Sequence, residues 1–443
     1  MLRPVSRLVD LLDHSLDQIH NMSPERAREI VLRGDPAAVR GIDGSFAIVA
    51  AEGQAVRLAR SLDRPMRYFL AKRHEGPALY VADRMDVLRD ALERDGLHGQ
   101  FHPSYTRMVP AHYVVDLALV GCPDPDPVYT RFFTPAPATL PNDLDVIGRH
   151  YVGALAAEIT KWLRSIEARA PGTEPIGVSF SGGIDSGAVL LVTYHAMLAL
   201  GLSPSRLKAF VLDLGGGPDL QQAREFLARV GLSMLLEEVE ASAETIDVQE
   251  TLQVLEDYKP LDVECAAMAL RLYEGIRARY PEWHHIADGE GGDENLKDYP
   301  IEENPELTIR SVIDNRMLYQ EGWGVGRIKH SLTYSGGLSR AYVRSYAPAR
   351  HFGFVPFSPY TRPNVVEVAE GIPFATLTGY DVPALYALKG DVVRRGVAAV
   401  TGFDMPVFEK RRFQHGALPV ERLRARLADT EAAYRRAFLN MYA

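Results

Sequence analysis

The spacing of apolar residues divides the chain into an early part with short strands and a later part in which strands and helices alternate. Residues 5–33 carry apolar residues at helical spacing, and Ser23 followed by Pro24 is typical of a helix start. From Gly41 onward, short apolar runs are separated by Gly, Asp or Pro, which predicts an antiparallel sheet. These runs lie at 46–50, 56–59 and 78–82, and a predicted helix follows at 86–97.

A proline-rich stretch separates the two parts. Six prolines, the last of them Pro141, indicate a linker, so we place a domain boundary near residue 140 and expect two domains, 1–140 and 141–443. Beyond the linker, alternating strand and helix patterns predict an α/β domain with a parallel sheet and crossover helices. The predicted elements are a helix at 144–168, a strand from Ile176, a strand at 207–212 and mainly helices beyond residue 300.

The composition is that of a globular protein that handles small molecules. Apolar residues make up 47% and charged residues 24% of the 443 positions, and the net charge of −9 disfavours nucleic acid as a partner. Only two cysteines, Cys122 and Cys265, occur, which is too few for a disulfide framework and favours a reducing compartment. No apolar run is long enough to span a bilayer and no signal peptide opens the chain, so we expect a cytoplasmic protein with no membrane partner.

The most informative stretch is residues 179–187, with the sequence SFSGGIDSG. It follows an apolar strand and leads into an apolar helix, so its two glycines form a turn at a helix N-terminus. Such a turn lets backbone N–H groups face one anion. The Ser181 and Ser186 hydroxyls can add hydrogen bonds to a phosphate, whereas Asp185 would hold Mg²⁺ against it. An ordinary capped strand-to-helix turn is the less probable alternative for the complete pattern.

Two further glycine-rich acidic loops follow predicted strands. Residues 213–219 read DLGGGPD and residues 285–294 read HIADGEGGDE. Ligands of an open parallel sheet bind beyond the carboxyl ends of its strands, so we expect both loops to face the same crevice as Ser181. The four acids of the second loop repel one another unless a cation or ordered hydrogen bonds compensate. A metal–phosphate site provides that compensation, and a solvated acidic turn is the alternative.

These motifs resemble those of the asparagine synthetase family. Residues 181–186 (SGGIDS) are similar to the pyrophosphate loop of the N-type ATP pyrophosphatases, and residues 288–294 (DGEGGDE) resemble the family's S-G-E-G-x-D-E loop. Lys410-Arg411-Arg412-Phe413, followed by Gly416, resembles the family's K-x-x-F-x-x-G segment. The resemblance covers about residues 140–420 and, more weakly, pieces of a glutaminase domain before them. Further matching segments are Gly217–Leu220, Val355–Phe357 and Tyr386–Lys389.

The resemblance implies a role for each matching residue. Magnesium would be held by Asp185 and Asp293, and pyrophosphate would be cradled by Ser181, Gly182, Gly183 and Ser186. The nucleotide would be lined by Ser179, Leu212, Asp288 and Gly289. Glu290 would orient or deprotonate the attacking amine, and Lys410 would neutralise charge on the α-phosphate and on the oxyanion. The implied cofactors are ATP and Mg²⁺. By itself, Lys410 in a basic run is more simply a surface lysine.

Three departures from the family pattern limit the resemblance. Position 2 is Leu2, where glutamine-dependent members expose a nucleophilic cysteine, and the helix predicted at 5–33 takes the place of the early strands. We therefore expect residues 1–140 to be a shortened glutaminase-like domain, resembling a truncated Ntn fold, without glutaminase activity. After Glu294, residues 295–300 (NLKDYP) replace the usual hydrophobic pair and Gly-Gly-Tyr. β-Lactam synthetases carry Tyr where this chain has Glu290.

The sequence therefore predicts an ATP-dependent ligase that adenylates a small-molecule or peptide carboxylate, releases pyrophosphate and AMP, and forms an amide with ammonia or an amine. An intramolecular ligase, of the β-lactam or lasso-peptide macrolactam type, remains open. A nucleotide-binding scaffold without catalysis is the alternative from another class. A homodimer is an open alternative for the quaternary structure. The identities of the acid and the amine do not follow from the sequence.

Overall fold

The computed structural model describes residues 5–53, 55–117, 127–299, 301–303, 307–314, 342–408, 417, 420–427 and 430–442. These residues form two compact units. The first comprises the described residues up to Thr134, together with Tyr342 and those from Arg435 onward. The second comprises the described residues of Pro135–Leu318 and Val343–Tyr434.

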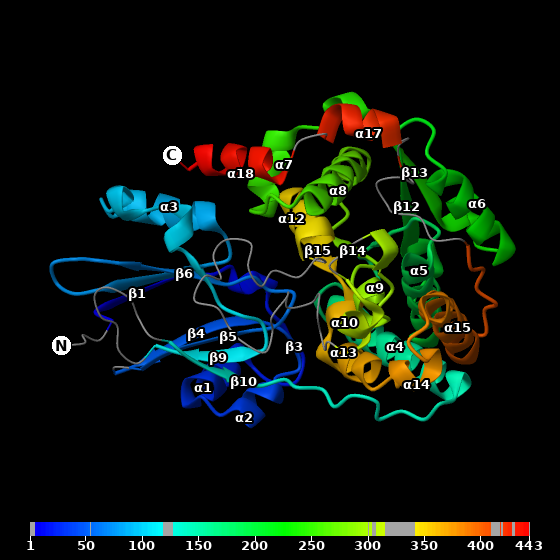
Figure 1. Ribbon diagram of the computed structural model, residues 1–443, viewed down its shortest axis with the longest axis horizontal. Helices are drawn as coiled ribbons and strands as arrows, with labels where there is room; N and C mark the ends of the chain where they lie inside the picture. The colour runs from blue at the N-terminus through cyan, green and yellow to red at the C-terminus, as the bar shows by residue number, and fades with distance from the viewer. Residues whose placement is uncertain are drawn as a thin grey trace. The chain divides into compact units, whose positions relative to one another are not determined.

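The first unit is built on two four-stranded sheets (Figure 1). All neighbouring strands are antiparallel except β1 and β7, which are parallel. One sheet has the order β1 (Arg7–Leu11), β7 (Ala78–Ala82), β6 (Arg67–Ala71) and β8 (Arg107–Met108). The other has the order β10 (Val128–Arg131), β9 (Tyr113–Asp116), β5 (Ala55–Arg60) and β4 (Ala47–Glu52). A short pair, β2 (Gln18–Ile19) and β3 (Gly44–Ser45), completes the strands described in this unit.

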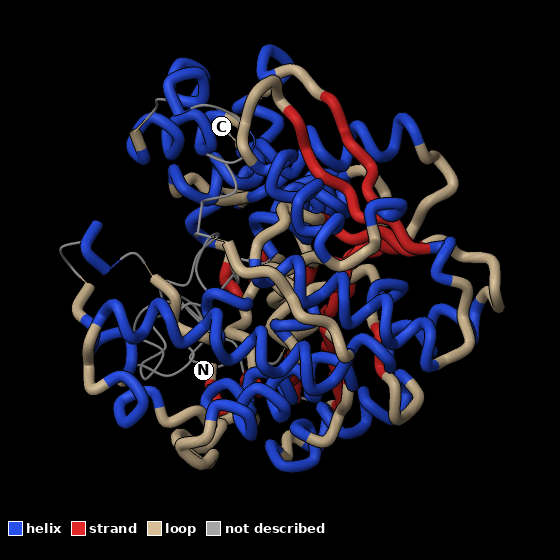
Figure 2. The backbone as a smooth tube through the Cα atoms, turned by 90° about the vertical axis from the view of Figure 1, so that its right-hand side faces the viewer, coloured by secondary structure: helices blue, strands red, loops and turns tan. Residues whose placement is uncertain are grey.

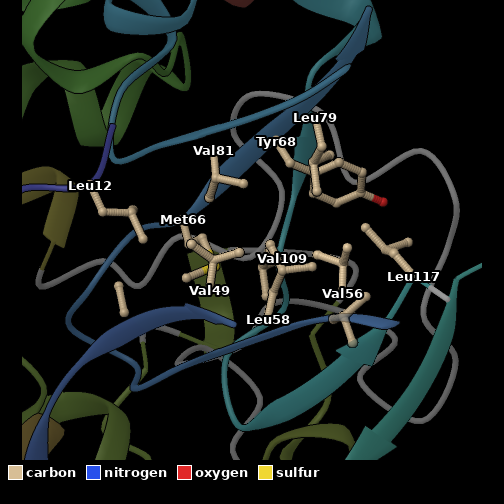
Figure 3. Packing of buried hydrophobic residues seen from close by; sticks show 12 residues of the cluster. Leu12, Val49, Val56, Leu58, Met66, Tyr68, Leu79, Val81, Val109 and Leu117 are labelled. Atoms are coloured by element: carbon tan, nitrogen blue, oxygen red, sulfur yellow. The ribbon is translucent and has the colours of Figure 1, made fainter. Parts of the chain in front are cut away.

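Alternate residues of these strands enter different cores, as the period of two in a strand requires. Val49, Leu58 and Val81 lie with their neighbours in a cluster between the two sheets (Figure 3). Residues of the opposite parity on β4 and β5 pack on α1 (Pro24–Arg33) and α2 (Pro36–Arg40). Those on β6 and β7 pack on α3 (Met85–Arg94). The unit is therefore layered helix, sheet, sheet, helix, and the prediction of antiparallel strands in the N-terminal region is confirmed.

The prediction of a helix over residues 5–33 is wrong for the first half of this range. Residues 7–11 form β1, paired with β7, and the helix begins only at Pro24, where the Ser23 side chain accepts a hydrogen bond from the Arg26 backbone N–H at 3.2 Å. Leu8 packs on the core between the sheets, whereas Val9 packs on the core beneath α3. Because both faces of β1 meet apolar neighbours, its sequence lacks the polar alternation that would have identified a strand.

The second unit contains the predicted parallel sheet with crossover helices. Its strand order is β13 (Leu236–Glu240), β12 (Leu207–Asp213), β11 (Ile176–Ser179), β14 (His285–Ala287) and β15 (Val355–Phe357), and all pairs are parallel. The crossover helices are α5 (Ile184–Ala199), α6 (Asp219–Arg229), α7 (Val248–Leu255) and α8 (Pro260–Arg279). Figure 2 shows the strands with helices packed around them. The earliest strand, β11, is central, so the strand order reverses between β11 and β14. A crevice for a ligand is expected there.

Further helices complete the second unit. α4 (Leu144–Arg169) crosses α15 (Val382–Thr401) closely where Gly148 meets Gly396. A Cβ on Gly148 would lie 2.6 Å from the Val392 carbonyl oxygen. The others are α9 (Gly292–Asn295), α10 (Ile309–Ile313), a π-helix (Tyr342–Tyr346), α12 (Ala347–His351), α13 (Pro363–Glu370), α14 (Phe374–Thr378), α17 (Val420–Leu427) and α18 (Glu431–Asn440), of which the π-helix and α18 straddle the division between the units. Among the described residues, no helix has both the length and the apolar character needed to cross a membrane.

Candidate active site

The glycine turn after β11 adopts the conformation that its sequence predicted. Gly182 has φ +72°, and a Cβ there would lie 2.9 Å from the backbone nitrogen of Ala223 on α6, so glycine is required. The Ser181 and Ser186 hydroxyl oxygens are 3.2 Å apart, and the backbone N–H of Gly183 donates to the Ser181 oxygen at 3.3 Å. Both hydroxyls therefore lie at the N-terminus of α5, a 16-residue helix whose dipole favours an anion.

The acidic loop after β14 packs directly on this turn. A Cβ on Gly289 would lie 2.6 Å from the backbone nitrogen of Ser186, and a Cβ on Gly292 would overlap the carboxylate of Asp185. Gly291 has φ +97° and precedes the short helix α9, which carries Asp293. The glycines of the loop thus permit the close approach of two segments about 100 residues apart in the sequence. The prediction that they share one crevice is consistent with this packing.

Asp185 and Asp293 converge on one cation, the ammonium of Lys389. The Lys389 Nζ donates to Asp185 Oδ2 at 2.6 Å and also to Asp293, and it lies 3.5 Å from Asp298 Oδ2. The Lys389 side chain, on α15, is only 3% exposed. Burial alone would lower the pKa of Lys389, but the three carboxylates outweigh burial and hold this pKa well above its usual value. Lys389 is therefore a permanent cation at the convergence of the two predicted metal ligands.

The geometry fits Mg²⁺ held together with phosphate. Asp185 and Asp293 can both reach a single positive centre, and carboxylate oxygens are the hard ligands that Mg²⁺ prefers. In the part of the chain that the structure describes, no group of three or more His, Cys, Asp or Glu side chains forms a metal site. Magnesium commonly binds to one or two carboxylates and completes its coordination with water and substrate phosphates, so two aspartates beside the phosphate turn are sufficient.

Glu290 is partly buried and lies in a charged environment beside this pair. Burial raises the pKa of Glu290 to about 8, although the guanidinium of Arg344 opposes the shift. The Arg344 Nε donates to Asp262 Oδ1 at 2.8 Å, and Arg344 belongs to the π-helix, a conformation that is frequent at functional sites. A glutamate that is neutral near pH 7 and charged slightly above it can exchange a proton with an amine.

The Asp288 side chain is held by a network of hydrogen bonds. Its Oδ2 accepts hydrogen bonds from Ser345 at 2.8 Å and from Ser358 at 2.9 Å, and its Oδ1 accepts the backbone N–H of Glu290 at 3.0 Å. Burial raises the pKa of Asp288 to about 6, against these three hydrogen bonds. The Tyr273 hydroxyl continues the network, at 2.7 Å from the Ser345 oxygen and 3.0 Å from the Ser179 oxygen. The network fixes the ends of β11, β14 and β15 together.

The remaining predicted residues are placed as follows. Leu212 is buried at the end of β12, and Asp213 Oδ1 accepts the backbone N–H of Gly215 at 2.9 Å in the loop that follows. That Ser179, Leu212, Asp288 and Gly289 line a nucleotide stays a prediction. Lys410 lies outside the described residues, as do Leu2, Cys122 and Gly416.

Sequence reasoning did not identify Lys389, Asp298 or Arg344 as site residues. A signal for Lys389 was present, because it occupies the buried stripe of α15 with Leu385 and Val392. A lysine on an apolar helix face requires a buried acidic partner. In the sequence, Lys389 belongs only to the short segment Tyr386–Lys389 that resembles the family. Its acidic partners could not be inferred without the fold.

A comparison with protein families supports this site. Residues 162–349 match the family described as asparagine synthase, which includes β11 to β14, the SGGIDS turn and the acidic loop. A comparison with curated proteins gave no match. The match begins after residue 140, so the glutaminase-like character of residues 1–140 stays a prediction. The part of the chain from residue 162 to residue 349 thus matches the asparagine synthase family.

Proposed function

We propose that this protein is an ATP- and Mg²⁺-dependent amide ligase that adenylates a carboxylate and releases pyrophosphate. The observation that carries the proposal is the convergence of Asp185 and Asp293 on one cationic centre, next to the Ser181 and Ser186 hydroxyls at the start of α5. A phosphate turn and a pair of carboxylates fit a magnesium–triphosphate. The match to the asparagine synthase family supports the same chemistry.

The proposed residue roles follow from the chemistry of adenylation. A carboxylate is a poor electrophile because its leaving group would be oxide, so its oxygen attacks the α-phosphorus and the bond to the β-phosphate breaks. The bound Mg²⁺ supplies positive charge to the phosphate oxygens during this step. Asp185 and Asp293 hold Mg²⁺, while the turn of residues 181–186 donates hydrogen bonds to the departing pyrophosphate.

The second step forms the amide. An amine attacks the carbonyl carbon of the acyl-adenylate and loses a proton, so that a C–N bond forms. The bond between this carbon and the AMP oxygen then breaks, and AMP leaves with its electron pair. We assign Glu290 to orient the amine and accept that proton, since its raised pKa places it near the working range of a general base. Lys410 is proposed to stabilise the oxyanion of the tetrahedral intermediate.

We propose free ammonia or a substrate amine as the source of nitrogen. A glutaminase of this family requires a reactive thiol. Cys265 is buried on α8, and burial raises its pKa to about 12, so it carries no thiolate near neutral pH. It also lies within a helix of the second unit. Cys265 is therefore unsuited to release ammonia from glutamine.

Isotope exchange between labelled pyrophosphate and ATP tests the adenylation. The protein is incubated with ATP, Mg²⁺ and a panel of amino acids, dicarboxylates and peptide acids, without added amine. We expect label to enter ATP only with the correct acid, because formation of the acyl-adenylate is reversible, and Asp185→Asn should abolish the exchange. Turnover that yields only ADP and phosphate would refute adenylation.

Product analysis separates the remaining alternatives. Mass spectrometry distinguishes an intermolecular amide from a cyclic product, which has lost one water without gaining an amine. The presence of Glu290, where β-lactam synthetases carry Tyr, favours the intermolecular reaction. Calorimetric binding of Mg²⁺·ATP without exchange or turnover on any acid would support a scaffold.

A further inference from the structure

Asp298 is a buried carboxylate that the proposed chemistry does not use. Its side chain is 9% exposed, and its backbone N–H donates to the Asp293 carbonyl oxygen at 3.0 Å. Asp298 Oδ2 lies 3.5 Å from the Lys389 Nζ. In the described part of the chain, Lys389 forms ion pairs with three carboxylates, those of Asp185, Asp293 and Asp298.

The loop that carries Asp298 is maintained against a local conformational cost. Lys297 has φ +55°, a left-handed conformation that favours glycine. It is held there by its buried side chain: Nζ donates to the Ile313 carbonyl oxygen at 2.8 Å and lies 3.8 Å from Glu370. These contacts of Lys297 fix the backbone immediately before Asp298.

The balance of charges around Lys389 shows what the Asp298 carboxylate contributes. Asp185, Asp293 and Asp298 together with Lys389 carry a formal charge of −2, which one Mg²⁺ neutralises. When Mg²⁺ takes oxygens of Asp185 and Asp293, Lys389 loses part of its compensation while it remains buried on α15. An uncompensated buried ammonium is strongly unfavourable, and it also repels the metal. Asp298 is the partner of Lys389 that is left.

We propose that Asp298 is a positioning residue that retains Lys389 beside the Asp185–Asp293 pair when a magnesium–nucleotide is bound. In this role Asp298 acts through the ammonium of Lys389 and is not itself a metal ligand. The inference rests on the proposed function, because it assumes that Mg²⁺·ATP binds between the two loops. It goes beyond that function by giving a role to a residue that the proposed chemistry does not use.

The test is calorimetric binding of α,β-methylene-ATP, which cannot be cleaved to pyrophosphate, at several Mg²⁺ concentrations. We expect Asp298→Asn to weaken binding by about tenfold and to raise the Mg²⁺ concentration needed for half-saturation, because a buried charge loses its partner. Asp298→Glu should recover most of the affinity. Glu158→Gln is the matched control, since it removes a buried carboxylate on α4 that pairs with Lys161 instead, and we expect less than about a twofold change.

A double-mutant cycle decides whether Asp298 acts through Lys389. In the Lys389→Met background, adding Asp298→Asn should change affinity by less than about twofold. A tenfold loss in that background, or an equal loss in Glu158→Gln, would overturn the inference. If wild type and Asp298→Asn bind the analogue equally well, this inference is overturned and the proposed function is not. Wild-type protein that binds no analogue would overturn the proposed function and this inference with it.

Discussion

At the scale of single residues, Lys389 is the group on which the site depends. It joins Asp185 from the turn after β11 to Asp293 from the loop after β14, and it is 3% exposed. An ammonium in this position keeps two like charges together in the absence of metal. It also competes with any cation that binds there.

We predict that Lys389→Met destabilises the metal-free protein by about 3 kcal/mol, because it leaves partly buried carboxylates without their counter-charge. Adding Mg²⁺ should then raise the thermal unfolding midpoint by more than it does in the wild type, since the competing ammonium is gone. Differential scanning calorimetry with and without Mg²⁺ measures both effects. Arg395→Met, which removes the exposed pair with Asp145, is the control and should show neither. A smaller response to Mg²⁺ in Lys389→Met than in wild type would contradict the prediction.

The pKa of Glu290 gives a pH dependence with a definite sign. The folded protein holds the Glu290 proton up to about pH 8, whereas an unfolded chain releases it near the usual value of 4.5. Its contribution to stability is therefore complete below about pH 4.5, decreases as the pH rises, and is lost above about pH 8. The slope is at most about 1.4 kcal/mol per pH unit.

Glu290→Gln keeps the neutral shape and removes the titration. We predict that the stability of this variant, relative to wild type, increases as the pH rises from about 5 to 8 and is constant above, because over this range unfolded wild type releases the Glu290 proton that the folded protein retains. Urea denaturation at several pH values measures the difference. A relative stability that is flat over this window would show that Glu290 is ionised in the folded protein. The same variant should lose amide formation and retain pyrophosphate exchange.

At the scale of elements, the site depends on how closely the loop after β14 approaches the start of α5. Gly289 allows this contact because a Cβ would lie 2.6 Å from the Ser186 backbone nitrogen, and backbone cannot move aside as a flexible side chain can. The approach sets the separation of Asp185 and Asp293. Small changes in packing here should therefore act on ligand binding as well as on stability.

We predict that Gly289→Ala destabilises the fold by about 1 to 3 kcal/mol through overpacking and weakens binding of the magnesium–nucleotide analogue. Gly153→Ala is the matched control, because Gly153 lies within α4 and a Cβ there meets nothing within 4 Å. Alanine in a helix interior is favourable, so the control should be neutral or slightly stabilising. Denaturation and calorimetric titration report the two effects, and normal nucleotide binding by Gly289→Ala would show that the contact is not needed.

At the scale of the whole molecule, the two units carry different kinds of buried polar groups. In the first unit, Arg64 is fully buried and its guanidinium donates to Asp17 at 2.6 Å and to Asp83 at 3.2 Å. These contacts join the residue before β2 to the residue after β7 and compensate the charge of Arg64. The second unit instead gathers three acidic residues, Asp185, Asp293 and Glu290, on the turn after β11 and the loop after β14. The chemistry is accordingly expected in the second unit.

We predict that glutamine does not serve as a nitrogen donor for this protein. With the correct acid, ammonium chloride or an amine should support amide formation, whereas glutamine at the same concentration should give neither amide nor glutamate. The physical reason is that Cys265, the cysteine within the described part of the chain, carries no thiolate near neutral pH, because burial raises its pKa to about 12. Chromatographic assay of glutamate measures the outcome, and glutamate formation that requires the acid and ATP would contradict it.

Features that depend on residues close together in the sequence could be predicted, whereas features that depend on contacts between distant residues could not. The SGGIDS turn, the parallel sheet and the strand after residue 284 could be predicted because turn residues and apolar runs act locally. The first strand could not, since β1 is apolar on both faces and its identity is decided by pairing with β7, about 70 residues away. Likewise, Asp298 in its loop shows no relation to Lys389 along the sequence, because the two are brought together only by the packing of α15.

The sequence by itself determined the chemical groups of the site and the two loops that carry them, because glycines, hydroxyls and carboxylates in fixed order specify a strand end, a turn and a helix start. Only the tertiary structure decided how those charges are balanced. Lys389 enters from α15 to join Asp185 and Asp293, Arg344 enters from a π-helix beside Glu290, and serines from two other segments fix Asp288. Charge compensation in a buried site depends on distance in space, and distance in space is a property of the fold.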